Sequence, residues 1–270
     1  MTTVDVSQRN AAFWDELCGS HLAGQLGVRD ASPGELARFD AAYLALYPYL
    51  LGYFPREHVE GRPVLEIGLG YGTLSEALAR MGADYHGLDI AAGPVEMARH
   101  RLAGVPGARP EQVQQGSALE LPFPDASFDL VASIGCLHHT GDLFGAIQEV
   151  RRVLRPGGRL VLMVYNRRSL RRLMPAPVWA LRRRRDRAGA DEALRARYDA
   201  RADGAAAPHT DFVTAPELRG LLHGLHDVRV ERRNIEGVPV RHVSQRSRSA
   251  LMDLRVDGLL GLDLYATARR

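Results

Sequence analysis

The sequence predicts an α/β protein built on a Rossmann-like, doubly wound, mostly parallel seven-stranded sheet. Short apolar runs alternate with helical patterns from residue 61 onward, which is typical of strand–helix–strand units. A glycine-rich turn directly follows the first of these runs. We expect four regions: a helical N-terminal cap or lid at 1–60, the core with the glycine-rich turn at 61–166, a basic insertion or lid after the fifth strand at 167–213, and a last helix with the final strands at 214–270.

The N-terminal region reads as helices. Phe13, Trp14 and Leu17 recur at helical spacing, and a second segment rich in Ala, Leu and Tyr ends near residue 55. Ser32 precedes Pro33 as a helix cap, and Glu35 follows at the spacing of a capping box.

Beyond residue 60 the elements follow in a regular order. The apolar runs predict strands at 64–67, 85–90, 111–115, 128–134, 159–166, 228–235 and 262–268. The helical patterns between them predict helices at 73–81, 94–102, 143–154 and 215–225, the last one capped by Thr214.

Composition narrows the class of protein. The 270 residues are 46% apolar and 25% charged, enough to bury a full core. No apolar run reaches the roughly 18 residues of a membrane span, and no secretory signal is visible, so we expect a soluble protein without integral membrane contact. Cys18 and Cys136 lie far apart and outside metal-ligand spacing. They predict a reduced, cytoplasmic setting, two buried thiols and no metal.

The charge is concentrated in one segment. All 35 basic residues are arginine, which excludes lysine Schiff bases and phosphate-loop lysines. Residues 167–187 hold nine arginines and one aspartate, a local charge of +8 in a chain whose net charge is +3. The rest of the chain is mildly acidic, which argues against a nucleic-acid-binding face. The basic segment is either the solvated face of a lid helix or an attractor for an acidic acceptor or anionic surface, with Leu173, Met174 and Trp179 as anchors.

The glycine-rich turn predicts a nucleotide site. Gly68, Gly70 and Gly72 allow a ligand to approach the backbone closely, at the start of a helix. A dinucleotide dehydrogenase needs a further glycine where this chain has Thr73, so the spacing disfavours NAD. Glu66 ahead of the turn would favour a cationic or amino group over a pyrophosphate. Asp89, which ends the second strand, suits a ribose diol, although a turn or cap role explains it equally well.

Five segments in this order resemble the motifs of class I S-adenosylmethionine-dependent methyltransferases, closest to the small-molecule branch: EIGLGYG, GLDI, GSALELPFPDASFDLV, SIGCLHHT and EVRRVLRPGGRLVL. The resemblance covers about residues 60–166 and implies S-adenosylmethionine as cofactor. It places Glu66, Gly68 and Gly70 beside the methionine part and Asp89 on the ribose. Ile90, Ser117 and Ala118 would surround the adenine, and Ser133 and Ile134 would face the sulfonium. Ser117 stands where the branch usually has an aspartate, which puts that contact in doubt.

The sequence says less about the residues that surround the methyl acceptor. His138 and His139 follow the fourth strand, and neighbours in sequence point in different directions, so we expect one of them at the site. We favour His139 because family members often carry a histidine there; a structural histidine is the alternative. Tyr165 and the pair His209 and Asp211 are secondary candidates. Four tyrosines and one tryptophan form either an aromatic lid or helical core: Tyr43, Tyr47, Tyr49, Tyr53 and Trp14.

We therefore expect methyl transfer to oxygen, nitrogen or carbon of a small molecule, and the Arg- and Ala-rich composition suggests bacterial secondary metabolism by association. An RNA or protein methyltransferase is disfavoured because SIGCL lacks an Asn/Asp-Pro-Pro-aromatic signature. A NAD-dependent dehydrogenase and a non-catalytic binding protein are the remaining alternatives. The sequence leaves open the acceptor, the use of a base and the oligomeric state, a homodimer included.

Overall fold

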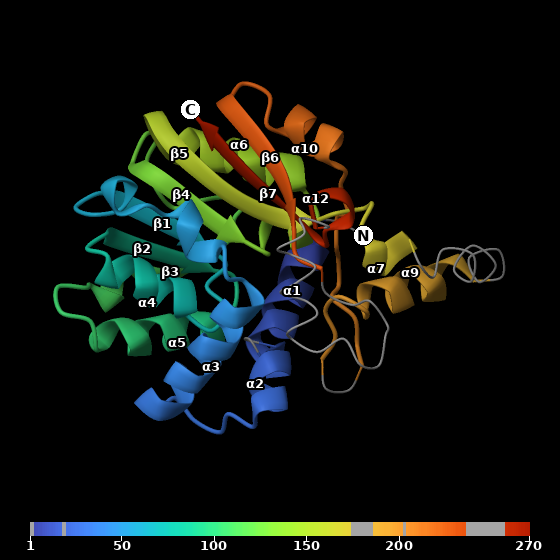
Figure 1. Ribbon diagram of the computed structural model, residues 1–270, viewed down its shortest axis with the longest axis horizontal. Helices are drawn as coiled ribbons and strands as arrows, with labels where there is room; N and C mark the ends of the chain where they lie inside the picture. The colour runs from blue at the N-terminus through green and yellow to red at the C-terminus, as the bar shows by residue number, and fades with distance from the viewer. Residues whose placement is uncertain (1–2, 18–19, 174–185, 202–203, 236–256) are drawn as a thin grey trace.

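The computed structural model describes residues 3–17, 20–173, 186–201, 204–235 and 257–270. Within these ranges the seven expected strands are present and form one sheet in the order β3-β2-β1-β4-β5-β7-β6 (Figure 1). No described helix is both long and apolar enough to cross a membrane. The strands are β1 Pro63–Ile67, β2 Asp84–Asp89, β3 Val113–Gln115, β4 Phe128–Ile134, β5 Leu154–Tyr165, β6 His226–Arg233 and β7 Asp263–Arg269.

The direction of the strands corrects one expectation. Strands β3, β2, β1, β4 and β5 are parallel, but β7 lies between β5 and β6 and is antiparallel to both. The sheet is therefore mixed, and the prediction of a mostly parallel sheet is wrong. Apolar runs identify strands but carry no direction, because direction depends on how the chain connects one strand to the next.

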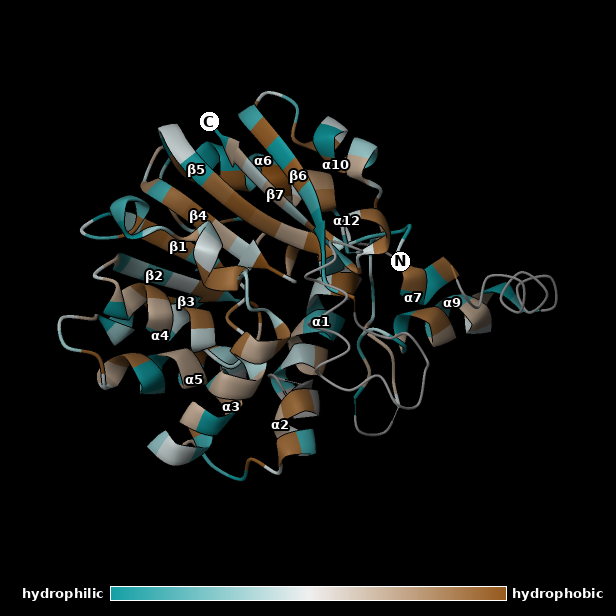
Figure 2. Cartoon of the chain, viewed as in Figure 1, coloured by the Kyte–Doolittle hydropathy of each residue, from teal (hydrophilic) through white to brown (hydrophobic). Residues whose placement is uncertain are grey.

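Two separate cores lie on the two faces of the sheet, as a doubly wound fold requires. Neighbouring residues of β1 show the division: Val64 packs on the side of α4 (Thr73–Arg80) and α5 (Ala92–Ala103). Leu65 packs on the side of α6 (Leu143–Val153) and α10 (Ala215–Leu221). The central strands are apolar along most of their length (Figure 2), as expected of strands buried on both faces.

Most element boundaries differ from the predicted ones by one or two residues, and three of the differences change the assignment of a segment. Residues 110–112 form the 3₁₀ turn η3 (Pro110–Gln112), so β3 keeps only three residues. Strand β5 begins at Leu154, five residues before the predicted start at 159, and includes the LRPGG segment. Helix α10 ends four residues early, at Leu221. Its start is as predicted, because Thr214 and Glu217 form a reciprocal capping box.

Helices fill the N-terminal region as predicted: α1 Thr3–Leu17, α2 Ser20–Leu26, α3 Pro33–Leu46, and the 3₁₀ turns η1 Leu50–Tyr53 and η2 Arg56–His58. Ser32 caps α3 by its backbone conformation, with Pro33 at the first helical position. The expected capping box is absent, because the Ser32 side chain makes no capping bond and Glu35 pairs with Arg38 instead.

The segment after β5 is described in part, as α7 (Leu170–Leu173) and α9 (Arg187–Arg195). Met174, Trp179 and the run Arg182–Arg185 lie outside the described residues, and Leu173 is 45% exposed. The chain then returns to the core, where Val213 bridges Asn166 and the Asp211 amide donates to the carbonyl of His138. Helix α12 (Asp257–Leu260) precedes β7.

Candidate active site

A cavity of about 210 Å³ opens at the carboxyl ends of β1, β2 and β4, where open parallel sheets bind ligands. This volume accommodates a ligand far larger than a few waters. Helices α1 and α3 contribute part of the wall. Eight of the predicted cofactor residues line the cavity: Glu66, Gly68, Gly70, Asp89, Ile90, Ser117, Ala118 and Ile134. Ser133 does not, because its side chain is fully buried behind the wall.

The glycine loop between β1 and α4 brings bare backbone to the cavity. Gly68 and Gly70 have φ angles of +86° and +52°, which side-chain-bearing residues rarely adopt. A Cβ at Gly68 would meet the Cβ of Cys136 and lie 2.8 Å from its Sγ. A Cβ at Gly70 would have nothing within 4 Å, so this part of the loop lies open. The loop is therefore a cradle in which a ligand can contact the backbone.

Asp89 is held rigidly at the end of β2. Its Oδ2 accepts a hydrogen bond from the Leu69 amide at 2.8 Å, and its Oδ1 accepts from the Ala91 amide at 2.9 Å. The carboxylate thus ties the glycine loop to the start of α5. These two bonds are the turn or cap role that the sequence also allowed for Asp89. Burial raises its pKa, against the effect of the backbone bonds. Each oxygen keeps a lone pair for a ligand, because a carboxylate offers about four acceptor positions.

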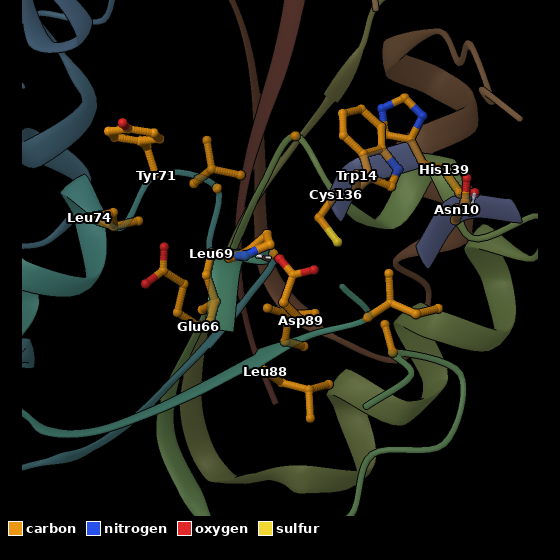
Figure 3. Close-up of a pocket in the computed structure, with 18 of the residues that line it drawn as sticks. Asn10, Trp14, Glu66, Leu69, Tyr71, Leu74, Leu88, Asp89, Cys136 and His139 are labelled. Carbon is orange, nitrogen blue, oxygen red and sulfur yellow. Dashed lines mark hydrogen bonds between the residues drawn. The ribbon is translucent and has the colours of Figure 1, made fainter. Parts of the chain in front are cut away.

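Glu66 is a second buried carboxyl group, 3% exposed, on the other side of the loop (Figure 3). Its Oε2 accepts hydrogen bonds from Ser75 at 2.7 Å and from Tyr85 at 2.5 Å. Burial raises the pKa of Glu66 to about 7; the two hydroxyl bonds oppose this rise and nearby Asp89 adds to it. A cationic ligand group beside Glu66 would therefore stabilise its ionised form.

At the end of β4 the wall contains Ile134 and Cys136. Cys136 is half-buried as a residue and lines the cavity instead of lying wholly in the core, which differs from the prediction; Cys18 lies outside the described residues. Burial of the thiol, with Asp89 and Glu66 nearby, raises the pKa of Cys136. The thiol therefore stays protonated and is a poor nucleophile.

The two adjacent histidines point in different directions. His139 lines the cavity, whereas His138 is fully buried and does not. Among the described residues neither ring nitrogen of His138 has a hydrogen-bond partner. Burial lowers the pKa of His138 well below its usual value, and it lowers that of His139 as well, so both rings are neutral near pH 7.

Both nitrogens of His139 face the segment that returns from the insertion. Its Nδ1 lies 2.8 Å from the carbonyl oxygen of His209, which assigns the proton to Nδ1 and the lone pair to Nε2. Nε2 lies 3.7 Å from Asp199 Oδ2, and both atoms are covered in the structure. Burial raises the pKa of Asp199, whereas the nearby His139 ring lowers it.

The secondary candidates lie behind His139. Tyr165 does not line the cavity; its hydroxyl donates to Asp199 Oδ1 at 3.1 Å. His209 Nε2 lies 3.1 Å from Asp211 Oδ1, also outside the wall. The sequence does not identify Asp199 as a site residue, because the insertion carries no motif and its fold is needed to bring position 199 to position 139.

The aromatic residues divide between the two expected roles. Tyr43 lines the cavity, and Trp14 lines it while packing on the His139 ring with a centroid distance of 4.7 Å. Tyr47, Tyr49 and Tyr53 do not line it; Tyr53 stacks on Tyr265 in the core. Ser7 and Asn10 of α1 also line the cavity, and nothing in their sequence context distinguished them from ordinary polar helix residues.

These residues fit S-adenosylmethionine. The glycine cradle accepts an extended chain, the two buried carboxyl groups match a ribose diol and an ammonium group, and no lysine or arginine in the described wall would repel the sulfonium. Within the described ranges no group of three His, Cys, Asp or Glu side chains is placed to hold a metal ion.

Comparison with known proteins agrees with this chemistry. Residues 65–162 match the family model described as a methyltransferase domain. The chain is 35% identical over 106 residues to demethylmenaquinone methyltransferase of Tropheryma whipplei, covering 39% of this chain and 43% of that protein. It is 33% identical over 125 residues to ubiquinone biosynthesis O-methyltransferase of Pectobacterium atrosepticum, covering 45% and 51%. It is 36% identical over 153 residues to 27-O-demethylrifamycin SV methyltransferase of Amycolatopsis mediterranei, covering 56% and 54%. The chain thus spans about half the length of these curated relatives.

Solved structures show the same fold. An S-adenosylmethionine-dependent methyltransferase from Methanosarcina mazei superimposes with a TM-score of 0.55 at 21% identity, covering 83% of this chain and 98% of the other. One from Mesorhizobium loti gives 0.54 at 20% identity, covering 84% and 98%.

Proposed function

We propose, from the class I S-adenosylmethionine-dependent methyltransferase domain that this chain carries at residues 65–162, that it methylates a small-molecule acceptor. The observation that supports this most is the juxtaposition of the glycine cradle with Asp89 and Glu66 at one edge of the sheet. The matched relatives include two named for O-methylation, so an oxygen acceptor is the first choice, and the rifamycin-related one supports a place in secondary metabolism.

In this proposal each wall residue has a part in holding the cofactor. Asp89 accepts hydrogen bonds from the ribose hydroxyls, and Glu66 faces the ammonium group across the cradle of Gly68 and Gly70. Ile90, Ser117 and Ala118 enclose the adenine, and Ile134 lies near the sulfonium. Ser133 supports Ile134 from behind the wall rather than touching a ligand.

The bound cofactor supplies a methyl group already activated by the positive sulfonium. The chain itself then has to align the acceptor and exclude water, which is where most of the rate enhancement of such a displacement arises. Helices α1 and α3 serve as the lid for this purpose, since Trp14 and Phe39 contribute side chains to the cavity wall.

Calorimetry with three ligands tests the proposal. We expect S-adenosylmethionine and S-adenosylhomocysteine to bind with micromolar or tighter affinity and NAD not to bind. Binding of NAD in the absence of S-adenosylhomocysteine binding would refute the proposal.

The raised pKa of Glu66 predicts that cofactor binding depends on pH. The free protein holds a proton on Glu66 below about pH 7, and an ammonium group placed beside it would favour the carboxylate, so the complex holds fewer protons. Affinity for S-adenosylhomocysteine should therefore rise about tenfold between pH 5.5 and pH 7.5, the equivalent of one pKa unit. Calorimetry at pH 6 in two buffers of different ionisation enthalpy should detect release of up to one proton. Glu66→Gln should bind with an affinity that no longer changes over this range; a flat profile for the unmodified protein would contradict the assignment.

His139 is the proposed base for a hydroxyl acceptor, because it is the neutral histidine of the wall and Asp199 can stabilise the imidazolium that forms. Its covered Nε2 must turn toward the acceptor to act. We expect His139→Ala to lower kcat by about 100-fold or more, in the range of general base catalysis, with little change in S-adenosylhomocysteine affinity. His138→Ala is the control: it should lower the melting temperature and leave kcat unchanged. A kcat for His139→Ala within threefold of the unmodified protein would mean that alignment alone drives the reaction.

A further inference from the structure

Asn10 of α1 brings an unpaired hydrogen-bond acceptor to the cavity. The side chain is 4% exposed and lines the cavity. Its Nδ2 donates to the carbonyl oxygen of His139 at 2.6 Å, and this contact fixes the orientation of the amide because a carbonyl can only accept. Oδ1 is therefore the other amide atom, and among the described residues it has no hydrogen-bond partner. A buried oxygen left unpaired costs about 1–3 kcal/mol, so a ligand that donates to it would recover that cost.

The position of Asn10 points to the acceptor rather than to the cofactor. Figure 3 shows Asn10 beside Trp14 and His139 on one side of the cavity, while Glu66 lies on the opposite side beyond Asp89. Helix α1 presents Ser7, Asn10 and Trp14 to the cavity at helical spacing, beside the loop that follows β4 and contains His139. The cofactor's own donors already have Asp89 and Glu66 as partners in the proposed binding mode.

The charge of the wall restricts the acceptor further. The described lining residues include the carboxyl groups of Glu66 and Asp89 and none of the arginines. A carboxylate acceptor would find no cationic side chain in the described wall, and its oxygens could not donate to Asn10 Oδ1. A neutral hydroxyl can donate to Oδ1 with its hydrogen while its oxygen keeps lone pairs for the methyl group.

We propose that Asn10 is a specificity-determining residue that selects an uncharged acceptor bearing a hydroxyl group, an alcohol or a phenol, over a carboxylate. This inference rests on the proposed methyl transfer. In that reaction the acceptor oxygen forms a bond to the methyl carbon, the carbon–sulfur bond breaks with its electron pair left on sulfur, and the hydroxyl proton passes to His139. Asn10 Oδ1 accepts the hydroxyl hydrogen while the acceptor binds; the hydrogen then turns from Oδ1 to His139 as the oxygen–carbon bond forms, and Asn10 takes no proton itself.

The test compares Asn10→Leu, which keeps the approximate volume and removes the acceptor oxygen together with the bond to the His139 carbonyl, with a control for the anchoring of α1. Asp15 is that control: its Oδ1 accepts from the Gly93 amide at 2.6 Å and so fastens α1 to α5, but it does not line the cavity. Asp15→Ala therefore loosens the helix without changing the wall. All proteins are assayed for formation of S-adenosylhomocysteine with matched pairs of phenols and benzoic acids, and of primary alcohols and fatty acids.

We expect the unmodified protein to methylate the hydroxyl member of the pairs. Asn10→Leu should lower kcat/KM for the best hydroxyl acceptor about 10- to 100-fold, mainly through KM, with S-adenosylhomocysteine affinity by calorimetry within threefold. Asp15→Ala should affect hydroxyl and carboxylate acceptors in equal proportion.

Several results would overturn the inference. For the unmodified protein, these are a preference for carboxylates and a lack of turnover with every hydroxyl acceptor. For Asn10→Leu, it is a loss of S-adenosylhomocysteine affinity at constant acceptor KM. For Asp15→Ala, it is the same loss of kcat/KM for the hydroxyl acceptor as in Asn10→Leu. Failure of the proposed function has a different signature, since the unmodified protein would then not bind S-adenosylhomocysteine at all.

Discussion

Replacing Asp89 with alanine should lower the affinity for S-adenosylhomocysteine at least about 100-fold, because hydrogen bonds to a charged group contribute about 1.5–3 kcal/mol each and two ribose hydroxyls would lose their partner. The same change removes the bonds from the Leu69 and Ala91 amides, so the glycine loop also loses its attachment to α5. Both effects lower the affinity for S-adenosylhomocysteine. Calorimetric titration of the purified variant gives the affinity, and a melting curve shows whether the fold persists.

Asp129→Ala is the matched control for Asp89→Ala. Asp129 lies on strand β4 of the same sheet and pairs with Arg155 at 2.9 Å, away from the cavity. Its replacement removes one carboxylate from the same sheet and should leave cofactor affinity unchanged. Unchanged affinity in Asp89→Ala itself would remove the ribose assignment.

Gly68→Ala should both destabilise the protein and abolish cofactor binding. The new methyl group would overlap Cys136 at a φ of +86°, so the cost combines left-handed backbone strain with overpacking, together about 2–5 kcal/mol in the free energy of unfolding. Urea titration measures this loss. Gly70→Ala separates the two causes: its φ is +52° and its Cβ would meet nothing within 4 Å, so only the strain remains.

A second change locates the overlap. Cys136→Ala keeps the Cβ that the new methyl group meets and should not rescue Gly68→Ala. Cys136→Gly removes that Cβ, so a double-mutant cycle with Gly68→Ala should show a favourable interaction of at least 1 kcal/mol, within the range found for residues in contact. Equal stability of Gly68→Ala and Gly70→Ala would show that the close contact between the two loops is unimportant.

The sequence predicted the parts of the site that depend on local chemistry. A glycine at positive φ and a carboxylate at a strand end are determined by the few residues around them in the sequence. Gly68, Gly70 and Asp89 could therefore be placed at one cavity without a structure. Neighbouring side chains point in different directions, which predicted that only one of His138 and His139 faces the cavity, and the family resemblance favoured His139. Ser133 does not line the cavity, because alternation along β4 turns its side chain into the core while Ile134 faces the cavity.

The remaining parts depend on tertiary structure. Asn10 sits in a helix whose pattern shows which residues share a face but not what that face covers. Asp199 reaches His139 only through the fold of the insertion, sixty positions later in the chain. The antiparallel placement of β7 depends on a connection rather than on the strand's own residues, and so the mixed sheet could not be read from apolar runs.

The packing of Trp14 on His139 at the cavity wall has a practical consequence for spectroscopy. The chain has two tryptophans, and the second, Trp179, can be replaced by phenylalanine to leave a single indole emitter. Because that indole borders the cavity, its emission depends on what occupies the cavity. The protein thus carries its own optical probe, with which ligand arrival and departure can be followed in real time without a label.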